Sequence, residues 1–237
     1  MNTTIPWDDK VSYSGVVGDI PSSQVDSELI VFVHGNSRDA SDWKRYFSYF
    51  IDKGINPSRL WAISFDNSRM THDDLSAQFE DFVTRCFNIT GQNKLSYISH
   101  SLGVTVGRYW MDEYDRYNNV SNFVGIAGAN HGLNVCGLCK LSKRLPKEHH
   151  LKPCQTLGTT IFKKPPIEKL NQSVGETPGD IEYYTIRGEL DGLYTGNLNS
   201  PKLDGAEVNK SVWAGHDGAR ESTESIETVF DWTTKTE

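Results

Sequence analysis

The chain has 237 residues, of which 37% are hydrophobic and 23% are charged, a composition typical of a globular protein with a sizeable core. Acidic residues outnumber basic ones, and the net charge of -7 disfavours nucleic acid and anionic membranes as partners. No run of about 18 apolar residues occurs, so no membrane-spanning helix is expected.

Strand-like and helix-like patterns alternate along the chain, which predicts an α/β protein with a mostly parallel sheet covered by helices on both faces. Apolar and β-branched runs predict strands at residues 29–33, 60–65, 95–99, 123–128, 183–187 and 208–213. Apolar residues at helical spacing predict a helix from about residue 41, helices at residues 75–87 and 104–114, and a closing helix from about residue 219.

Residues 130–178 interrupt this alternation, because their hydrophobic periodicity is poor and Lys, Pro and Cys are frequent among them. We interpret this segment as an insertion above the sheet and not as a second domain. The sequence therefore predicts a single domain over residues 1–237, with a cap-like insertion at approximately 130–178.

Ser101 follows the third predicted strand directly and precedes a helical pattern. Residues 99–103, Ser-His-Ser-Leu-Gly, fit the G-x-S-x-G nucleophile elbow, with Ser in place of the first Gly. Small residues are needed two positions before and after the nucleophile, since larger side chains would collide with the neighbouring strand and helix. The alternative is that Ser101 only caps the helix, which is a common role for Ser.

A serine nucleophile needs a base, and His216 is the best placed of the seven histidines. With this elbow the catalytic residues run in the order Ser, acid, His along the chain, which excludes His34, His72 and His100 as the base. His216 lies between the last predicted strand and the last predicted helix, where a loop can reach Ser101.

The acid should follow a strand between Ser101 and His216. The predicted strand at residues 183–187 is followed by Glu189 and Asp191. We predict Asp191, because the turn with Gly192 can direct its carboxylate towards the His216 ring, and we keep Glu189 as the reserve. The carboxylate would fix the tautomer of the base and stabilise its imidazolium form.

Two backbone amides are candidates for an oxyanion hole. Asn36 follows the buried run at residues 29–33, and Leu102 follows the predicted nucleophile. Two such donors aimed at one tetrahedral oxygen are what acyl transfer requires.

Together these elements resemble an α/β-hydrolase, and more narrowly the small bacterial lipases and esterases of the Bacillus lipase A and class 2 lipase type. The resemblance rests on six stretches: VFVHGN, YISHSLGVTVGRYW, VGIAGANHG, GETPGD, ELDGLY and KLDGAEVNKSVWAGHDG. It implies an α/β-hydrolase fold, with Ser101, Asp191 and His216 as the triad and Asn36 and Leu102 as oxyanion donors. Ser99 stands where the family usually has Gly or Ala.

Three of the four cysteines, Cys136, Cys139 and Cys154, lie within the insertion. The related lipases carry a disulfide in this segment, so the resemblance implies that Cys154 pairs with Cys136 or Cys139. A zinc site with His149 and His150 is the alternative, although the spacing is not that of a finger or ribbon. Cys86 lies on an apolar helix face and is predicted to be a core residue, unless it pairs with the cysteine left over.

These observations predict a serine carboxylic-ester hydrolase that needs no metal and no cofactor. The expected partner is a small-molecule or lipid ester, with possible transient contact with a lipid interface, and the chain is expected to act as a monomer. A polyester depolymerase of the polyhydroxyalkanoate type, an amidase or thioesterase, and a non-catalytic hydrolase-fold binding protein are the alternatives. Trp43, Trp110 and Tyr194 are candidates for an acyl pocket, with core packing the favoured role for each.

The first ten residues, MNTTIPWDDK, lack the charged and then apolar layout of a signal peptide. The chain is therefore either cytosolic or begins after a removed signal. The cysteines favour an extracellular, secreted protein.

Overall fold

The sheet of this protein is mostly parallel and has seven strands in the order β1-β3-β2-β4-β5-β6-β7. We analysed a computed structural model, which describes residues 15–17, 25, 27–65, 71–134 and 166–234. All neighbouring strands pair in parallel except the edge strand β1, which pairs with β3 antiparallel. The strands are β1 (Gly15–Val17), β2 (Leu29–Val33), β3 (Leu60–Ser64), β4 (Leu95–His100), β5 (Val120–Ile126), β6 (Glu182–Gly188) and β7 (Val208–Val212).

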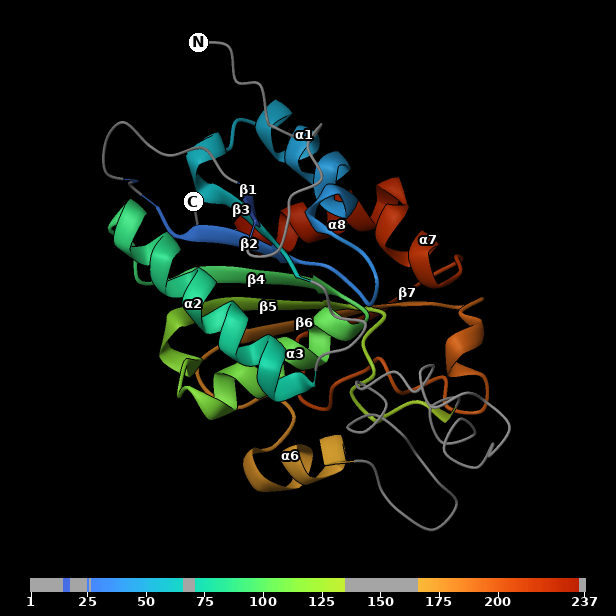
Figure 1. Cartoon of the computed structure of the whole chain (residues 1–237). Helices are drawn as coiled ribbons and strands as arrows, with labels where there is room; N and C mark the ends of the chain where they lie inside the picture. Colours follow the sequence, from blue (N-terminus) through green and yellow to red (C-terminus); the bar gives the residue numbers. More distant parts are fainter. Residues whose placement is uncertain (1–14, 18–24, 26, 66–70, 135–165, 235–237) are drawn as a thin grey trace.

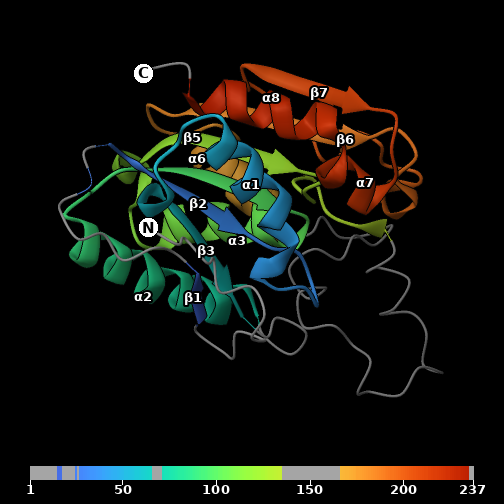
Figure 2. The ribbon, with the colours of Figure 1, turned by 90° about the horizontal axis from the view of Figure 1, so that it is seen from above.

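Helices cover both faces of this sheet, which confirms the predicted α/β class (Figure 1). The two views together place α2 and α3 on one face and α1 and α8 on the other (Figure 2). The described helices are α1 (Lys44–Asp52), α2 (His72–Thr90), α3 (Leu102–Glu113), α6 (Pro166–Val174), α7 (His216–Glu221) and α8 (Thr223–Thr234).

Aromatic side chains fill both layers between sheet and helices. Phe32 of β2 contacts Trp43, with ring centroids 5.3 Å apart, and Phe50, with ring centroids 5.8 Å apart, on the α1 side. Tyr97 of β4 contacts Phe79 of α2 on the opposite side at 5.3 Å. Burying such a side chain contributes roughly 2–3 kcal/mol to the free energy of folding. The core therefore holds the central strands rigidly at the positions where the chain leaves the sheet.

Trp43, Trp110 and Tyr194 belong to this core, since their side chains are 0%, 0% and 3% exposed. The favoured interpretation of these three residues as core packing is confirmed, and they do not line an open acyl pocket.

The described structure differs from the sequence prediction in several elements. The three-residue β1 was not predicted, and β5 begins at Val120, three residues earlier than expected. The polar start of β5 is explained by Asn122, which donates a hydrogen bond to Ser96 Oγ inside the sheet at 3.0 Å. Polar residues that satisfy one another can thus extend a buried strand beyond its apolar run.

The closing helix, predicted as one helix from about residue 219, begins three residues earlier and is divided into α7 and α8. The division lies at Ser222, whose Oγ accepts a hydrogen bond from the Ser225 amide at 3.1 Å, as an N-cap does. Helix α7 begins at His216, so this residue lies at a helix start and not in a loop before the helix.

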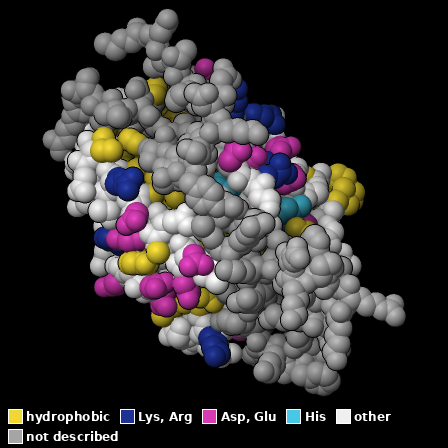
Figure 3. Space-filling model, viewed as in Figure 1, with side chains coloured by type: hydrophobic (Ala, Val, Ile, Leu, Met, Phe, Trp, Pro, Cys, Tyr) yellow, Lys and Arg dark blue, Asp and Glu magenta, His cyan; other side chains and the backbone are white. Residues whose placement is uncertain are grey.

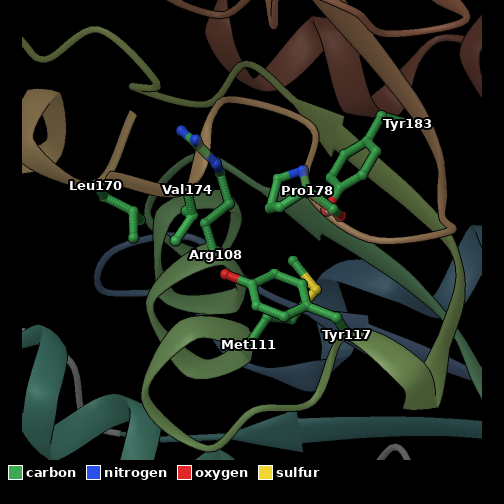
Figure 4. A pocket seen from close by; sticks show the side chains of 7 residues that line it. All are labelled: Arg108, Met111, Tyr117, Leu170, Val174, Pro178 and Tyr183. Carbon is green, nitrogen blue, oxygen red and sulfur yellow. The ribbon is translucent and has the colours of Figure 1, made fainter. Parts of the chain in front are cut away.

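The predicted insertion at 130–178 contains a helix that the sequence did not predict, α6 (Pro166–Val174). Its buried Leu170 and its Val174 face α3 across a gap that is too small for a water molecule (Figure 4). The buried guanidinium of Arg108 donates hydrogen bonds to Asn130 and Asn171 and so attaches α6 to the segment after β5. We therefore interpret this gap as part of the packing of α6 on α3 and not as a binding site. Residues 135–165 of the insertion lie outside the described residues.

No helix in the described parts of the chain is both long enough and apolar enough to span a membrane.

Candidate active site

Ser101 occupies the turn between β4 and α3 in a strained backbone conformation. Its φ of 55° and ψ of -118° fall in a region that residues other than Gly rarely adopt. Ser101 lies at the N-cap position of α3, but within the described structure its side chain makes no capping hydrogen bond. The geometry therefore argues against the simple capping role and matches the nucleophile elbow.

Small residues around Ser101 allow the turn to close. A Cβ on Gly103 would lie only 2.7 Å from the carbonyl oxygen of Val33 and 2.8 Å from that of His34. Ser99, in the other small position, is completely buried, and its Oγ donates a hydrogen bond to the Val124 carbonyl at 3.2 Å. Ser99 is therefore accommodated where Gly was expected, because its hydroxyl has a partner.

The three residues of the predicted triad lie together at the carboxyl edge of the sheet. The Nε2 atom of His216 is 2.8 Å from Ser101 Oγ, and its Nδ1 atom is 2.6 Å from Asp191 Oδ2. Asp191 follows β6 and is 3% exposed. Its second oxygen, Oδ1, accepts a hydrogen bond from the Leu193 amide at 3.0 Å. Glu189, the reserve acid, instead pairs with Arg187.

Close backbone contact holds the segment that carries Asp191 to the segment that carries His216. The Leu190 amide donates a hydrogen bond to the Ala214 carbonyl at 3.0 Å. A Cβ on Gly188 would lie 2.4 Å from that same carbonyl, so only Gly permits this approach. The Tyr194 hydroxyl donates a hydrogen bond to the Ala127 carbonyl and fixes the turn after Asp191.

One predicted oxyanion residue, Leu102, follows Ser101 directly, and the other, Asn36, follows Gly35, which packs against Ser101. Leu102 is the first residue of α3, where amides have no acceptor within the helix. Asn36 is reached through Gly35, at which a Cβ would lie 3.1 Å from Ser101 Cβ. The segment from β2 that carries Asn36 therefore lies directly against the elbow.

His34 anchors that segment, a role that the sequence did not suggest. Its Nδ1 donates a hydrogen bond to the Gly35 carbonyl at 2.8 Å, and its Nε2 accepts one from the Phe65 amide at 3.1 Å. Burial lowers the pKa of His34 to about 4, so the ring is neutral and Nε2 can accept. His34 thereby ties the end of β2 to the end of β3.

An exposed ion pair joins the same two sides of the site. Arg38, two residues after Asn36, contacts the carboxylate of Asp217, the residue after His216. The sequence carried no signal for this pair beyond two opposite charges on separate segments. Exposed pairs contribute little to stability, roughly 0–1 kcal/mol.

The amino-acid sequence matches the class 2 lipase family over residues 27–174, which is more than half of the chain. The chain belongs to this family. Membership makes it a carboxylic-ester hydrolase, in agreement with the resemblance seen in the motifs.

Solved structures similar to this class 2 lipase confirm the α/β-hydrolase fold. The mature lipase BlEst2 of Bacillus licheniformis is 16% identical, with a TM-score of 0.69, over 91% of this chain and 96% of that one. Carboxylesterase CesB of Bacillus subtilis is 14% identical, with a TM-score of 0.60, over 95% of this chain and 90% of that one. Aspergillus fumigatus lipase B is 15% identical, with a TM-score of 0.65, over 95% of this chain and 59% of that one.

The predictions for the cysteine-rich segment lie outside the described residues. Cys136, Cys139 and Cys154 fall there, as do His149 and His150, so the disulfide, the zinc alternative and the extracellular location stay predictions. Cys86 is buried and free, as expected for a core residue. Among the residues that the structure describes, no group of His, Cys, Asp and Glu side chains is arranged to hold a metal ion.

Proposed function

We propose that this class 2 lipase hydrolyses carboxylic esters through a Ser101–His216–Asp191 triad and a covalent acyl-enzyme. The observation that supports this most strongly is the series of two hydrogen bonds, from Ser101 Oγ to His216 Nε2 and from His216 Nδ1 to Asp191 Oδ2. Such a series is the arrangement in which a histidine can accept the proton of a serine while a carboxylate stabilises the resulting charge.

In the first half of the reaction, Ser101 Oγ forms a bond to the ester carbonyl carbon as its proton passes to His216 Nε2. The backbone amides of Asn36 and Leu102 donate hydrogen bonds to the carbonyl oxygen as it becomes negative, and each is worth roughly 3 kcal/mol of barrier. His216 then gives the proton to the leaving alkoxide, and the alcohol departs. The acyl group stays on Ser101.

In the second half, His216 takes a proton from water while the water oxygen bonds to the acyl carbon. The collapse of the tetrahedral intermediate breaks the bond to Ser101, which recovers its proton from His216. The carboxylic acid is released and the enzyme returns to its starting state.

This mechanism predicts a trappable acyl-enzyme. A p-nitrophenyl ester mixed with enzyme at high concentration should release a burst of about one equivalent of p-nitrophenol wherever deacylation is slow. Intact-protein mass spectrometry after an acid quench should find one added acyl group, and peptide mapping should assign it to Ser101. Steady hydrolysis with no covalent species, and with no loss of activity after treatment with a fluorophosphonate, would contradict the proposal.

We also propose that the enzyme acts on esters at an uncharged lipid–water interface. Three exposed apolar side chains, Leu190, Leu193 and Trp213, are close in sequence to Asp191 or His216 and form what we call the apolar rim; they are 54%, 41% and 80% exposed. Hydrophobic and histidine side chains are neighbours at one margin of the surface (Figure 3). The net charge of -7 favours an uncharged interface over an anionic one.

Replacing two residues of the apolar rim, Trp213→Ser with Leu193→Ser, should lower the ratio of activity on emulsified triglyceride to activity on a dissolved short ester. We expect a decrease of about 30-fold or more, because each of the two large apolar side chains loses roughly 1–2 kcal/mol of transfer free energy. Ile89→Ser is the matched control, since Ile89 is 45% exposed at the far end of α2. An unchanged ratio would contradict the interface proposal. Cleavage of a polyester film but not of triglyceride would show that the substrate is a polyester and not a lipid.

A further inference from the structure

His100 is a second histidine in contact with the proposed base, and the proposed mechanism gives it no step. Its side chain is 1% exposed, and its ring centroid lies 4.8 Å from that of His216. On its other side, a Cβ on Gly35 would lie 3.1 Å from His100 Nδ1. One buried imidazole therefore touches both the segment that carries the base and the segment that carries Asn36.

The protonation of His100 follows from its contacts. Its Nε2 is 3.2 Å from the carbonyl oxygen of His216, and because a carbonyl only accepts, Nε2 must carry the hydrogen. The Nδ1 atom then holds a lone pair, which is buried without a hydrogen-bond partner among the described residues. Burial, followed by the positive charge of a protonated His216, holds the pKa of His100 well below its usual value. The ring is therefore neutral, and adds no positive charge beside the imidazolium of His216.

His216 is thus held at two points by consecutive residues of one turn. Its ring contacts Ser101 Oγ at 2.8 Å, and its backbone carbonyl accepts from His100 at 3.2 Å. The residue before it, Gly215, is the N-cap of α7 and provides no side-chain cap in the described structure. The hydrogen bond from His100 is a further contact, which ties the carbonyl of His216, the first residue of α7, to the residue before Ser101.

We propose that His100 is a positioning residue, which fixes the backbone of His216 relative to Ser101 by donating the Nε2–H hydrogen bond to the His216 carbonyl. The inference rests on the proposed triad and adds a residue to it. His100 transfers no proton and does not contact the substrate.

Three substitutions separate the hydrogen bond from the bulk of the ring. His100→Phe keeps a ring but cannot donate, so kcat for a dissolved p-nitrophenyl ester should fall by about 10- to 100-fold while KM stays within about twofold. His100→Gln should restore most of kcat, because the Gln amide nitrogen reaches about as far as Nε2. His100→Asn should not, because its amide is too short to reach the carbonyl.

Tyr183→Phe is the matched control for the loss of a buried hydrogen bond. Tyr183 is 1% exposed, and its hydroxyl donates to the Pro178 carbonyl at 2.7 Å, away from Ser101 and His216. We expect this variant to lose stability and to keep kcat. The rate constant for labelling of Ser101 by a fluorophosphonate gives a second measure, which should decrease in the same order as kcat across the His100 variants.

Equal kcat in wild type and His100→Phe would overturn the proposal, as would equal losses in His100→Gln and His100→Asn. If His100→Phe does not fold, the comparison of kcat between His100→Gln and His100→Asn tests the proposal by itself. A loss of kcat in Tyr183→Phe as large as in His100→Phe would also overturn it. Wild-type protein that neither hydrolyses esters nor reacts with the fluorophosphonate would instead contradict the triad itself.

Discussion

Ser101→Ala should abolish ester hydrolysis, lowering kcat by about 10⁵-fold or more on every ester that the wild type cleaves. The variant lacks Ser101 Oγ, the proposed nucleophile that His216 Nε2 contacts, and so no acyl-enzyme can form. The measurement is release of p-nitrophenol from esters of several chain lengths, with circular dichroism and thermal unfolding to show that the variant is folded.

Because the backbone of Ser101 is strained, Ser101→Gly serves as a second inactive variant that tests whether loss of activity comes from loss of folding. Ser101→Gly should be as inactive as Ser101→Ala, yet should unfold at a higher temperature than Ser101→Ala, because Gly adopts a φ of 55° and a ψ of -118° without steric cost. The difference should be about 1 kcal/mol. Activity near the wild-type level in either folded variant would show that another group attacks the ester.

Asp191→Asn should lower kcat by about 10³- to 10⁴-fold while leaving KM nearly unchanged. The Leu193 amide needs an acceptor, so the Asn oxygen should turn towards it and leave the amide NH₂ facing His216 Nδ1. His216 would then have to accept at Nδ1 and carry its hydrogen on Nε2, and in that tautomer it cannot take the proton of Ser101. Steady-state kinetics on a dissolved ester measures the effect.

Glu189→Gln is the matched control for Asp191→Asn, because Glu189 was the other acid that the sequence offered. Its carboxylate pairs with Arg187 at 3.0 Å and makes no hydrogen bond to His216 within the described structure. We expect kcat within about twofold of the wild type. A large loss in Glu189→Gln together with a small one in Asp191→Asn would reverse the assignment of the acid.

The parts of the site that the sequence predicted are those in which one residue type is physically required. The elbow needs a small residue at position 103, because a Cβ there would meet two backbone carbonyls. Strands that are buried on both faces need continuous apolar runs, and the run LIVFV made β2 recognisable. Since parallel strands end at one edge, the residues that follow β4 and β6 were expected to lie close together.

The parts that the sequence missed depend on pairings between distant residues. Strand β1 has three residues, too few to show a period. Helix α6 is short, and its buried face, which includes Ile167 and Leu170, is too small to give a clear helical pattern. The hydrogen bonds of His34 and His100 are made with backbone atoms, and every residue type has the same backbone amide and carbonyl except Pro, so the amino-acid sequence does not indicate these partners. The division at Ser222 did carry a signal, since Ser is a common N-cap, but the apolar pattern obscured it.

The proposed nucleophile and the proposed base are 115 residues apart, and the base follows the outermost strand, β7. A chain still being synthesised carries Ser101 long before it can present His216, so the proposed mechanism gives it no esterase activity while it emerges from the ribosome. After dilution from denaturant, recovery of ester hydrolysis would report that β6 and β7 have docked. Collapse of the aromatic core alone would restore no hydrolysis. Turnover is therefore a readout of complete folding that needs no added label.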